Sequence, residues 1–245
     1  MTRIDFACRA HVVEEMDRPD CPLVGLHRTL AHFNAINRMF SRYRGMLNEG
    51  VVNDMARGEA RRYRLVDLGA GGCDIARWVV RRCRARRLRI AISAIEHDPR
   101  VAAYARAANA GYPEIDVVEA DVLDRGILAG ADFVFANHLL HHLSDMQCIE
   151  LLRNVDRARP RRYLLNDLMR SPWTYYGFLL TTSVFFRNSF VCSDGLASIR
   201  RGFTLPEVRA LVRAAAAVLP VSVRRLVPGR FVITGGTAVG DLPTG

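Results

Sequence analysis

Glycines and two aspartates stand close together in the run Val66-Asp67-Leu68-Gly69-Ala70-Gly71-Gly72-Cys73-Asp74. A β-type run precedes this stretch and a helical run follows it, so it forms the turn between a strand and its helix. Glycines there let the backbone approach a ligand closely, and the first N–H groups of the helix are free to meet that ligand. The pattern predicts a ligand site at this turn; a tight turn without a ligand is the alternative.

The same turn argues against two common nucleotide-binding motifs. The dinucleotide fingerprint needs a third glycine where Asp74 stands, which weakens a nicotinamide or flavin interpretation. A phosphate-binding loop needs a lysine, and the sequence has none.

A histidine cluster, His138, His141 and His142, follows the β-type run that ends near Ala136. In helical geometry these side chains would share one face. Histidine titrates near neutral pH, so we expect His141 first, and His138 second, to act as a general base or to orient an acceptor. The alternative is that the cluster bonds the backbone at the strand exit and shapes a pocket.

Asp167 closes a later strand and is expected to touch a histidine or the acceptor, or else to cap the following turn. Three clustered histidines could bind zinc, but no carboxylate or cysteine stands at a matching spacing. We therefore expect no metal.

The elements that position these residues alternate between strand and helix from Tyr63 to about Leu168. Alternation of this kind predicts an α/β fold with a parallel sheet covered on both faces. The expected strands are Arg64–Leu68, Arg89–Ile95, Ile115–Glu119, Phe133–Ala136 and Tyr163–Leu165, and the expected helices are Asp74–Cys83, Val101–Ala110 and Asp145–Val155.

The two ends of the sequence differ from this middle part. Near the start, apolar residues recur on one helical face over Leu23–Tyr43. Near the end, Thr204 and Glu207 form a capping box for a helix that runs to about Leu219. The runs Val221–Val227 and Arg230–Thr234 then flank Pro228-Gly229, which predicts an antiparallel hairpin. We expect an N-terminal helical cap over 1–60 and one domain over 61–245.

The bulk composition fits one globular domain of 245 residues. The formal net charge of +10 comes from arginine alone, and it permits a nucleic-acid partner without favouring one. Six cysteines without a C-x-x-C pair, and no leader-like start, predict free thiols and a cytoplasmic protein. The apolar run Trp173–Phe186 is shorter than the roughly 20 residues of a membrane span.

The strand-end motifs together resemble class I S-adenosylmethionine-dependent methyltransferases. Asp67, Gly69 and Gly71 match the acidic residue and first two glycines of motif I, while Cys73 replaces the third glycine. The resemblance implies a seven-stranded Rossmann-like, mostly parallel sheet and S-adenosylmethionine as cofactor. It implies that Glu96 takes the ribose hydroxyls and that Asp121 accepts from the adenine amino group, with cofactor contacts from Asp67, Gly69, Ala70, Gly71, Glu96, His97, Asp121, Val122 and Asn137.

Within that superfamily, Asn137-His138-Leu139-Leu140-His141-His142-Leu143 resembles a segment of the ubiquinone and menaquinone C-methyltransferases. The residues from Arg187-Asn188 through Ser198 to Thr204 further resemble small bacterial methyltransferases of polyketide-type pathways. These resemblances imply a small apolar or phenolic acceptor, quinone- or polyketide-like, methylated on oxygen or carbon. They also imply an acceptor-covering insert over about 170–203, in which Trp173, Tyr176 and Phe186 line the pocket.

Three alternatives stay open at this point. Residues Trp173–Phe186 could instead pack in the core or at a homodimer interface. A nucleic-acid methyltransferase is a rival, although the amino-directed motif [DNS]-P-P-[YFW] is missing where Asn137 stands. A non-methylating relative that only binds S-adenosylmethionine is the other.

Overall fold

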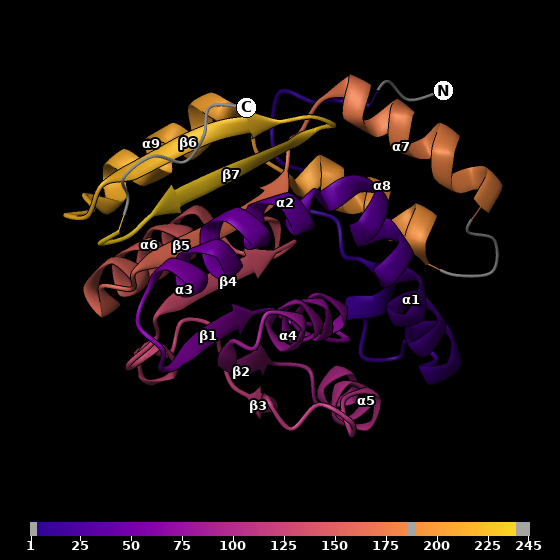
Figure 1. Cartoon of the computed structure of the whole chain (residues 1–245). Helices are drawn as coiled ribbons and strands as arrows, with labels where there is room; N and C mark the ends of the chain where they lie inside the picture. Colours follow the sequence, from indigo (N-terminus) through magenta and orange to yellow (C-terminus); the bar gives the residue numbers. More distant parts are fainter. Residues whose placement is uncertain (1–3, 186–189, 239–245) are drawn as a thin grey trace.

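The computed structural model describes residues 4–185 and 190–238. Its centre is a seven-stranded sheet with the order β3-β2-β1-β4-β5-β7-β6 (Figure 1). The strands β1 to β5 are parallel, and β7 pairs antiparallel with both β5 and β6. Their bounds are Arg62–Leu68, Arg89–Glu96, Ile115–Glu119, Phe133–Asn137, Arg162–Leu168, Val221–Leu226 and Arg230–Gly235.

The expected fold class is confirmed, including the C-terminal antiparallel hairpin. The central strands β4 and β5 are buried along their whole length, and their sequences are correspondingly apolar except at the ends that reach the site. Gly229, the third residue after β6, has a φ of +55°, a backbone conformation that glycine adopts without strain. The chain can therefore turn back there and pair β7 against β6.

Helices cover both faces of the sheet (Figure 1). One face carries α2 (Tyr43–Leu47), α3 (Asn53–Arg57), α4 (Asp74–Ala85) and α5 (Pro99–Ala108), whose apolar side chains share one core cluster with β1 and β2. The other face carries α6 (Asp145–Ala158) and α9 (Leu205–Ala215), which share a second cluster with β4, β5 and β7.

Two expected helices are shorter in the structure. The N-terminal helix is not continuous to Tyr43, because α1 (Leu23–Ile36) passes into a π-helical segment, Asn37–Ser41, and Arg42 then turns left-handed with a φ of 53°. The C-terminal helix ends at Ala215 rather than near Leu219, because Ala216 also adopts a left-handed φ.

Two further helices, α7 (Pro172–Phe185) and α8 (Val191–Arg201), pack on one another and gather with α1 beyond the carboxyl ends of the parallel strands (Figure 1). Gly195 of α8 makes this close packing possible, since a Cβ there would lie 2.3 Å from the Phe178 ring. The helices α1, α7 and α8 therefore form a layer above the carboxyl edge of the sheet.

Among the described residues, no helix combines the length and apolar character of a membrane-crossing segment.

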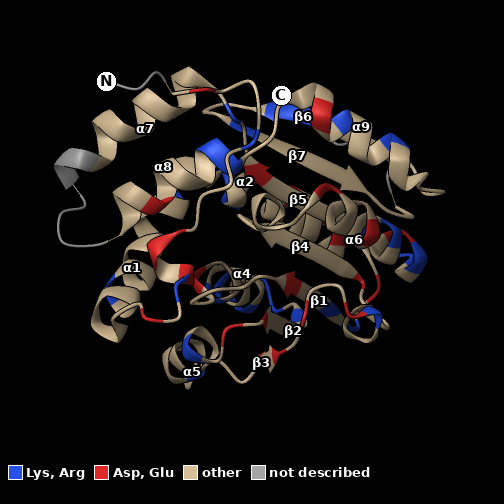
Figure 2. Ribbon diagram, turned by 180° about the vertical axis from the view of Figure 1, so that it is seen from behind, with Lys and Arg blue, Asp and Glu red and all other residues tan. Residues whose placement is uncertain are grey.

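The arginines are spread over several elements, including α4, α5, α6 and α9, as Figure 2 shows. Many of them are tied to carboxylates or carbonyls, such as Arg84 to Glu114 and Arg153 to the end of α9. All six cysteines lie in the described part of the chain and are unpaired. The division at residue 60 stays a prediction.

Candidate cofactor and acceptor site

A cavity of about 510 Å³ opens at the carboxyl edge of the sheet, where β1 and β4 lie side by side. The strand order reverses at this point, and open α/β sheets bind ligands in such a crevice. All nine residues that the resemblance assigns to the cofactor line this cavity, as do His138 and His141. The sequence-based expectations thus converge on one space.

The glycine-rich turn adopts the backbone that its sequence requires. Gly69 and Gly71 have φ values of 66° and 51°, in the left-handed region that disfavours other residues. A Cβ on Gly71 would meet no atom within 4 Å, so its open side is available to a ligand. Cys73, which replaces the third motif glycine, also takes a left-handed φ of 58° and is fully buried.

Glu96 is held in place by backbone donors at the end of β2. Its Oε1 accepts the N–H groups of His97 and Asp98 at 2.9 and 3.1 Å, and its Oε2 accepts that of Gly71 at 3.1 Å. The carboxylate therefore bridges the first two strand-end turns. Oε2 accepts only one of these three N–H groups, so its second lone pair can still accept a ligand hydroxyl from the cavity.

The third strand-end turn is organised by Asp121. Its Oδ1 accepts the N–H of Leu123 at 2.9 Å, while the exposed side chain lines the cavity beside the buried Val122. Asp98 caps α5 by accepting the N–H of Arg100 at 2.8 Å. His97 lies at the rim, and its hydrogen bond with Glu96 raises the pKa of the imidazole.

Two carboxyl groups are buried beside the glycine turn. Burial raises the pKa of Asp67 to about 8, and the nearby charges of Asp74 and Glu96 add to this. Burial also raises the pKa of Asp74, whose two oxygens accept from the Asn37 amide at 3.3 and 3.2 Å. Burial thus favours the neutral, protonated form of both carboxyl groups beside the glycine turn.

A buried polar network that the sequence did not reveal joins α1 to the sheet. The Asn37 side chain accepts from Asn137 at 3.0 Å, and Asn137 in turn accepts from Asn166 at 2.7 Å and from Arg230 at 3.0 Å. Asn37 lies on a helical segment far from the motifs, so no spacing signal could identify it. The network fixes Asn137 at the cavity wall.

The expectation that the three histidines share a helical face is wrong. His138 has a left-handed φ of 61°, which prevents a helix, and only a short 3-10 turn follows at Leu140–His142. His138 Nε2 lies 3.2 Å from Arg230 Nη1. Burial is the main cause that holds the pKa of His138 well below its usual value, and the charge of Arg230 is the second. His138 is therefore neutral, and it accepts a hydrogen bond at Nε2.

His141 is buried and bonded to the end of β5. Its Nδ1 lies 2.7 Å from Asp167 Oδ1, and its backbone N–H donates to Asp167 Oδ2 at 3.1 Å. Burial opposes a charge on His141, but the carboxylates of Asp167 and Glu14 outweigh it and raise the pKa to about 9. The same pairing holds the pKa of Asp167 far below its usual value despite burial. Of the two predicted roles for Asp167, contact with a histidine is the one that the structure contains.

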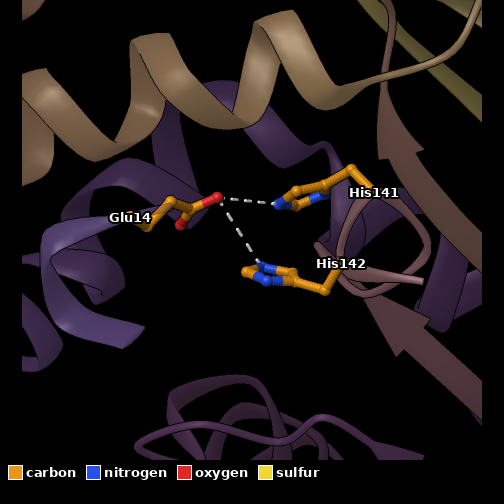
Figure 3. Close-up of side chains that lie close together, drawn as sticks. All are labelled: Glu14, His141 and His142. Carbon is orange, nitrogen blue, oxygen red and sulfur yellow. Dashed lines mark ion pairs between the residues drawn. The ribbon is translucent and has the colours of Figure 1, made fainter. Parts of the chain in front are cut away.

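Glu14, from the N-terminal segment, points at His141 and His142 (Figure 3). Its Oε1 lies 3.6 Å from His141 Nε2 and 3.8 Å from His142 Nε2. The helix α8 holds the segment in place: Ser198 Oγ donates to Glu14 at 2.7 Å, and Asp194 accepts the N–H groups of Glu15 and Met16. Glu14 lies in the predicted N-terminal cap but outside every predicted helix and strand, so no sequence pattern pointed to it.

The aromatic residues expected to line the acceptor pocket are placed differently. Trp173 is 90% exposed and Tyr176 is 55% exposed, and neither lines the cavity. Phe186 lies outside the described residues. Phe178, on the opposite side of α7, reaches the cavity instead, together with Val191 of α8.

Comparisons with known proteins agree with this geometry. Residues 66–160 match the family model described as a methyltransferase domain. Among curated proteins, no sequence matches the chain.

Three solved structures illustrate the likeness in fold. An O-methyltransferase family protein from Burkholderia thailandensis shares 18% identity at a TM-score of 0.59, covering 89% of this chain and 62% of its own. Human N-acetylserotonin methyltransferase in complex with SAM shares 17% sequence identity at a TM-score of 0.57, and the match covers 87% of this chain and 56% of that protein. The CurJ carbon methyltransferase shares 11% sequence identity at a TM-score of 0.62, and the match covers 91% of this chain and 63% of that protein.

This chain therefore spans about three fifths of the length of these proteins. The family match shows a methyltransferase domain over residues 66–160, and the solved structures show that the chain shares the fold of methyltransferases, in agreement with the resemblance that the strand-end motifs indicated.

Proposed function

We propose that this chain binds S-adenosylmethionine and directs its methyl group to a small acceptor. The observation that carries the proposal is that the glycine turn, Glu96, Asp121 and the His141 ring line one continuous cavity. The matched methyltransferase domain, residues 66–160, contains these strand ends and the histidine cluster. The cofactor would supply an electrophilic methyl group. The chain would bind and orient the cofactor and the acceptor, and would remove the acceptor proton.

The residues present fit such a cofactor. Glu96 offers a carboxylate that three backbone N–H groups preorient, and its Oε2 keeps a lone pair for a ribose hydroxyl. Asp121 would accept from the adenine amino group at the cavity rim. The open side of Gly71 leaves room for close approach to the backbone, and Asn137 would face the methionine portion.

His141 is our choice for the residue that takes the acceptor proton. Ionised Asp167 can only accept a hydrogen bond, so Nδ1 of His141 carries a hydrogen and Nε2, on the Glu14 side of this cavity-lining residue, is the nitrogen left for proton transfer. This arrangement is that of a base oriented by a carboxylate. Nε2 must lose its own proton before it can accept one, because the pKa of about 9 keeps the ring charged at neutral pH.

A small acceptor suits the far end of the cavity better than a nucleic acid does. Phe178, Val191 and Ile199 give that end an apolar wall, as small-molecule sites usually have. Glu14 and Asp17 also line it, and their charges would repel a phosphate backbone.

Calorimetry with S-adenosylmethionine and its demethylated product tests the cofactor part. Turnover of S-adenosylmethionine with phenolic and β-dicarbonyl acceptors tests the transfer, with His141→Ala as the variant expected to lose about 10²–10⁴ in rate. Absence of cofactor binding would refute the proposal. Binding without turnover on any acceptor would instead favour a non-methylating relative.

A further inference from the structure

We propose that Glu14, His141 and His142 form a binding site for a divalent transition-metal ion of the Zn²⁺ or Co²⁺ type. Their three candidate ligand atoms, Glu14 Oε1 and the two Nε2 atoms, lie within 4.8 Å of one another (Figure 3). The inference is independent of methyl transfer. It departs from the expectation of a metal-free site, which rested on sequence spacing that could not include Glu14.

The donor set and its dimensions suit such an ion. Two imidazole nitrogens and one carboxylate oxygen are ligands that Zn²⁺ and its neighbours accept. Bonds of about 2.0–2.1 Å in a tetrahedron put ligand atoms about 3.3 Å apart. The distances from Glu14 Oε1 to the two Nε2 atoms are 3.6 and 3.8 Å, so these edges need to contract by only a few tenths of an ångström.

Both imidazoles have an outer carboxylate partner that aims Nε2 at the site. Asp167 Oδ1 lies 2.7 Å from His141 Nδ1, and Asp17 Oδ2 lies 3.3 Å from His142 Nδ1. Histidines that bind metals commonly place their other N–H on a carboxylate, which fixes the ring and strengthens the donor. Here the arrangement occurs twice around one point.

His141 Nε2 also lacks any other partner. The atom is buried, and it makes no hydrogen bond with the described part of the chain. A buried polar atom without a hydrogen bond is costly, so this lone pair is available to a bound ligand. Glu14 Oε1 does accept from Ser198 Oγ at 2.7 Å, which leaves its second lone pair directed toward the rings.

The local charge favours a dication. Glu14, Asp17 and Asp167 are carboxylates, and the cationic side chain nearest to them in the cluster is Arg201, at 3.5 Å from Glu14 and 3.6 Å from Asp17. With both imidazoles neutral, these three negative charges face two positive charges, that of Arg201 and that of Arg230, which acts on Asp167. The cluster therefore keeps a net negative charge, which attracts a cation.

Three protein ligands leave a coordination position open toward the cavity, as catalytic rather than structural zinc sites do. A metal ion and a proton would compete for the same lone pair on His141 Nε2. The metal-loaded chain would therefore be unable to use His141 as a base.

Titration of chelator-treated wild type with Co²⁺, followed by its visible absorption, and with Zn²⁺ by equilibrium dialysis tests the site. We expect one equivalent to bind, with a dissociation constant raised at least about tenfold in His142→Asn and in Glu14→Gln. Asp17→Asn should weaken binding by about 10–100-fold through the outer partner. His11→Gln, an exposed histidine outside the cluster, is the matched control and should bind as wild type does.

Because His142 is only partly buried, the His142→Asn variant is expected to fold even if Glu14→Gln does not. No saturable binding by wild type would overturn the proposal. Equal affinity in wild type, His142→Asn and His11→Gln would overturn it as well.

Discussion

Asp167 binds His141 twice, through Oδ1 to the ring Nδ1 at 2.7 Å and through Oδ2 to the backbone N–H at 3.1 Å. One carboxylate at the end of β5 thereby sets both the position and the tautomer of the histidine. Asp167 does not line the cavity, so it acts through His141 as a positioning residue.

Replacing Asp167 with Asn tests this role. The amide can donate to Nδ1, which would place the hydrogen on Nε2 and remove the basic lone pair from the cavity. We expect kcat to fall by about 10²–10⁴ while the dissociation constant of S-adenosylmethionine changes little. Asp156→Asn, which removes a carboxylate that caps the turn after α9, is the control. Equal losses in both variants would point to a folding effect.

The pH dependence of methyl transfer should report the His141 proton. With a pKa of about 9, only about 1% of the rings are neutral at pH 7, so kcat/KM should rise with pH toward about 9. Glu14→Gln removes a carboxylate that stabilises the charged ring, and the rise should move to lower pH. The measurement needs a chelator and an acceptor that does not titrate in this range. An unmoved profile in Glu14→Gln would contradict the assignment.

Glu96→Ala should weaken cofactor binding. The variant removes the acceptor expected for the ribose hydroxyls, which should raise the free energy of binding by about 1–3 kcal/mol. Glu119 ends the neighbouring strand β3 but is exposed and paired with Arg106, so Glu119→Ala is the matched control. Calorimetry that finds equal affinities for wild type and Glu96→Ala would reject the assigned cofactor pose.

Zinc should inhibit methyl transfer if both proposals hold. The ion would occupy the Nε2 lone pair of His141, so added Zn²⁺ should lower the rate of the chelator-treated wild type. In His142→Asn, the same Zn²⁺ concentrations should inhibit at least about tenfold less, relative to the metal-free rate of that variant. Equal inhibition of both would show that zinc acts elsewhere.

The sequence predicted the sheet, and the residues that it suggested for a cofactor line one cavity, because both depend on local patterns. Strand-end residues such as Glu96 and Asp121 lie where parallel strands must place them, at one edge of the sheet. Gly69 and Gly71 adopt a left-handed backbone, which glycine takes up without strain, so these residue types already indicate the turn. The alternation of strand and helix then allows only a few sheet topologies, because the crossovers between parallel strands are right-handed.

The acceptor side could not be predicted in the same way, because it is built from contacts between distant segments. Glu14 meets His141 across 127 positions of sequence, and Asn37 meets Asn137 across 100. The helical-face prediction for the histidines failed because a left-handed residue, His138, interrupts the turn. Which side of α7 faces inward was equally hidden, since that helix is apolar nearly all round.

Phe178 and Tyr176 therefore offer a direct test of the acceptor pocket. Both are aromatic residues on α7, but Phe178 lines the cavity whereas Tyr176 is 55% exposed. Each methylene of an acceptor tail buried in the cavity should contribute about 0.8 kcal/mol, so KM should fall along a series of alkyl-extended phenols. Phe178→Ala should flatten this trend without changing the affinity for S-adenosylmethionine, and Tyr176→Ala should preserve it. If Tyr176→Ala flattened the trend and Phe178→Ala did not, the acceptor would lie on the outer face of α7 and the cavity would have been assigned to the wrong ligand.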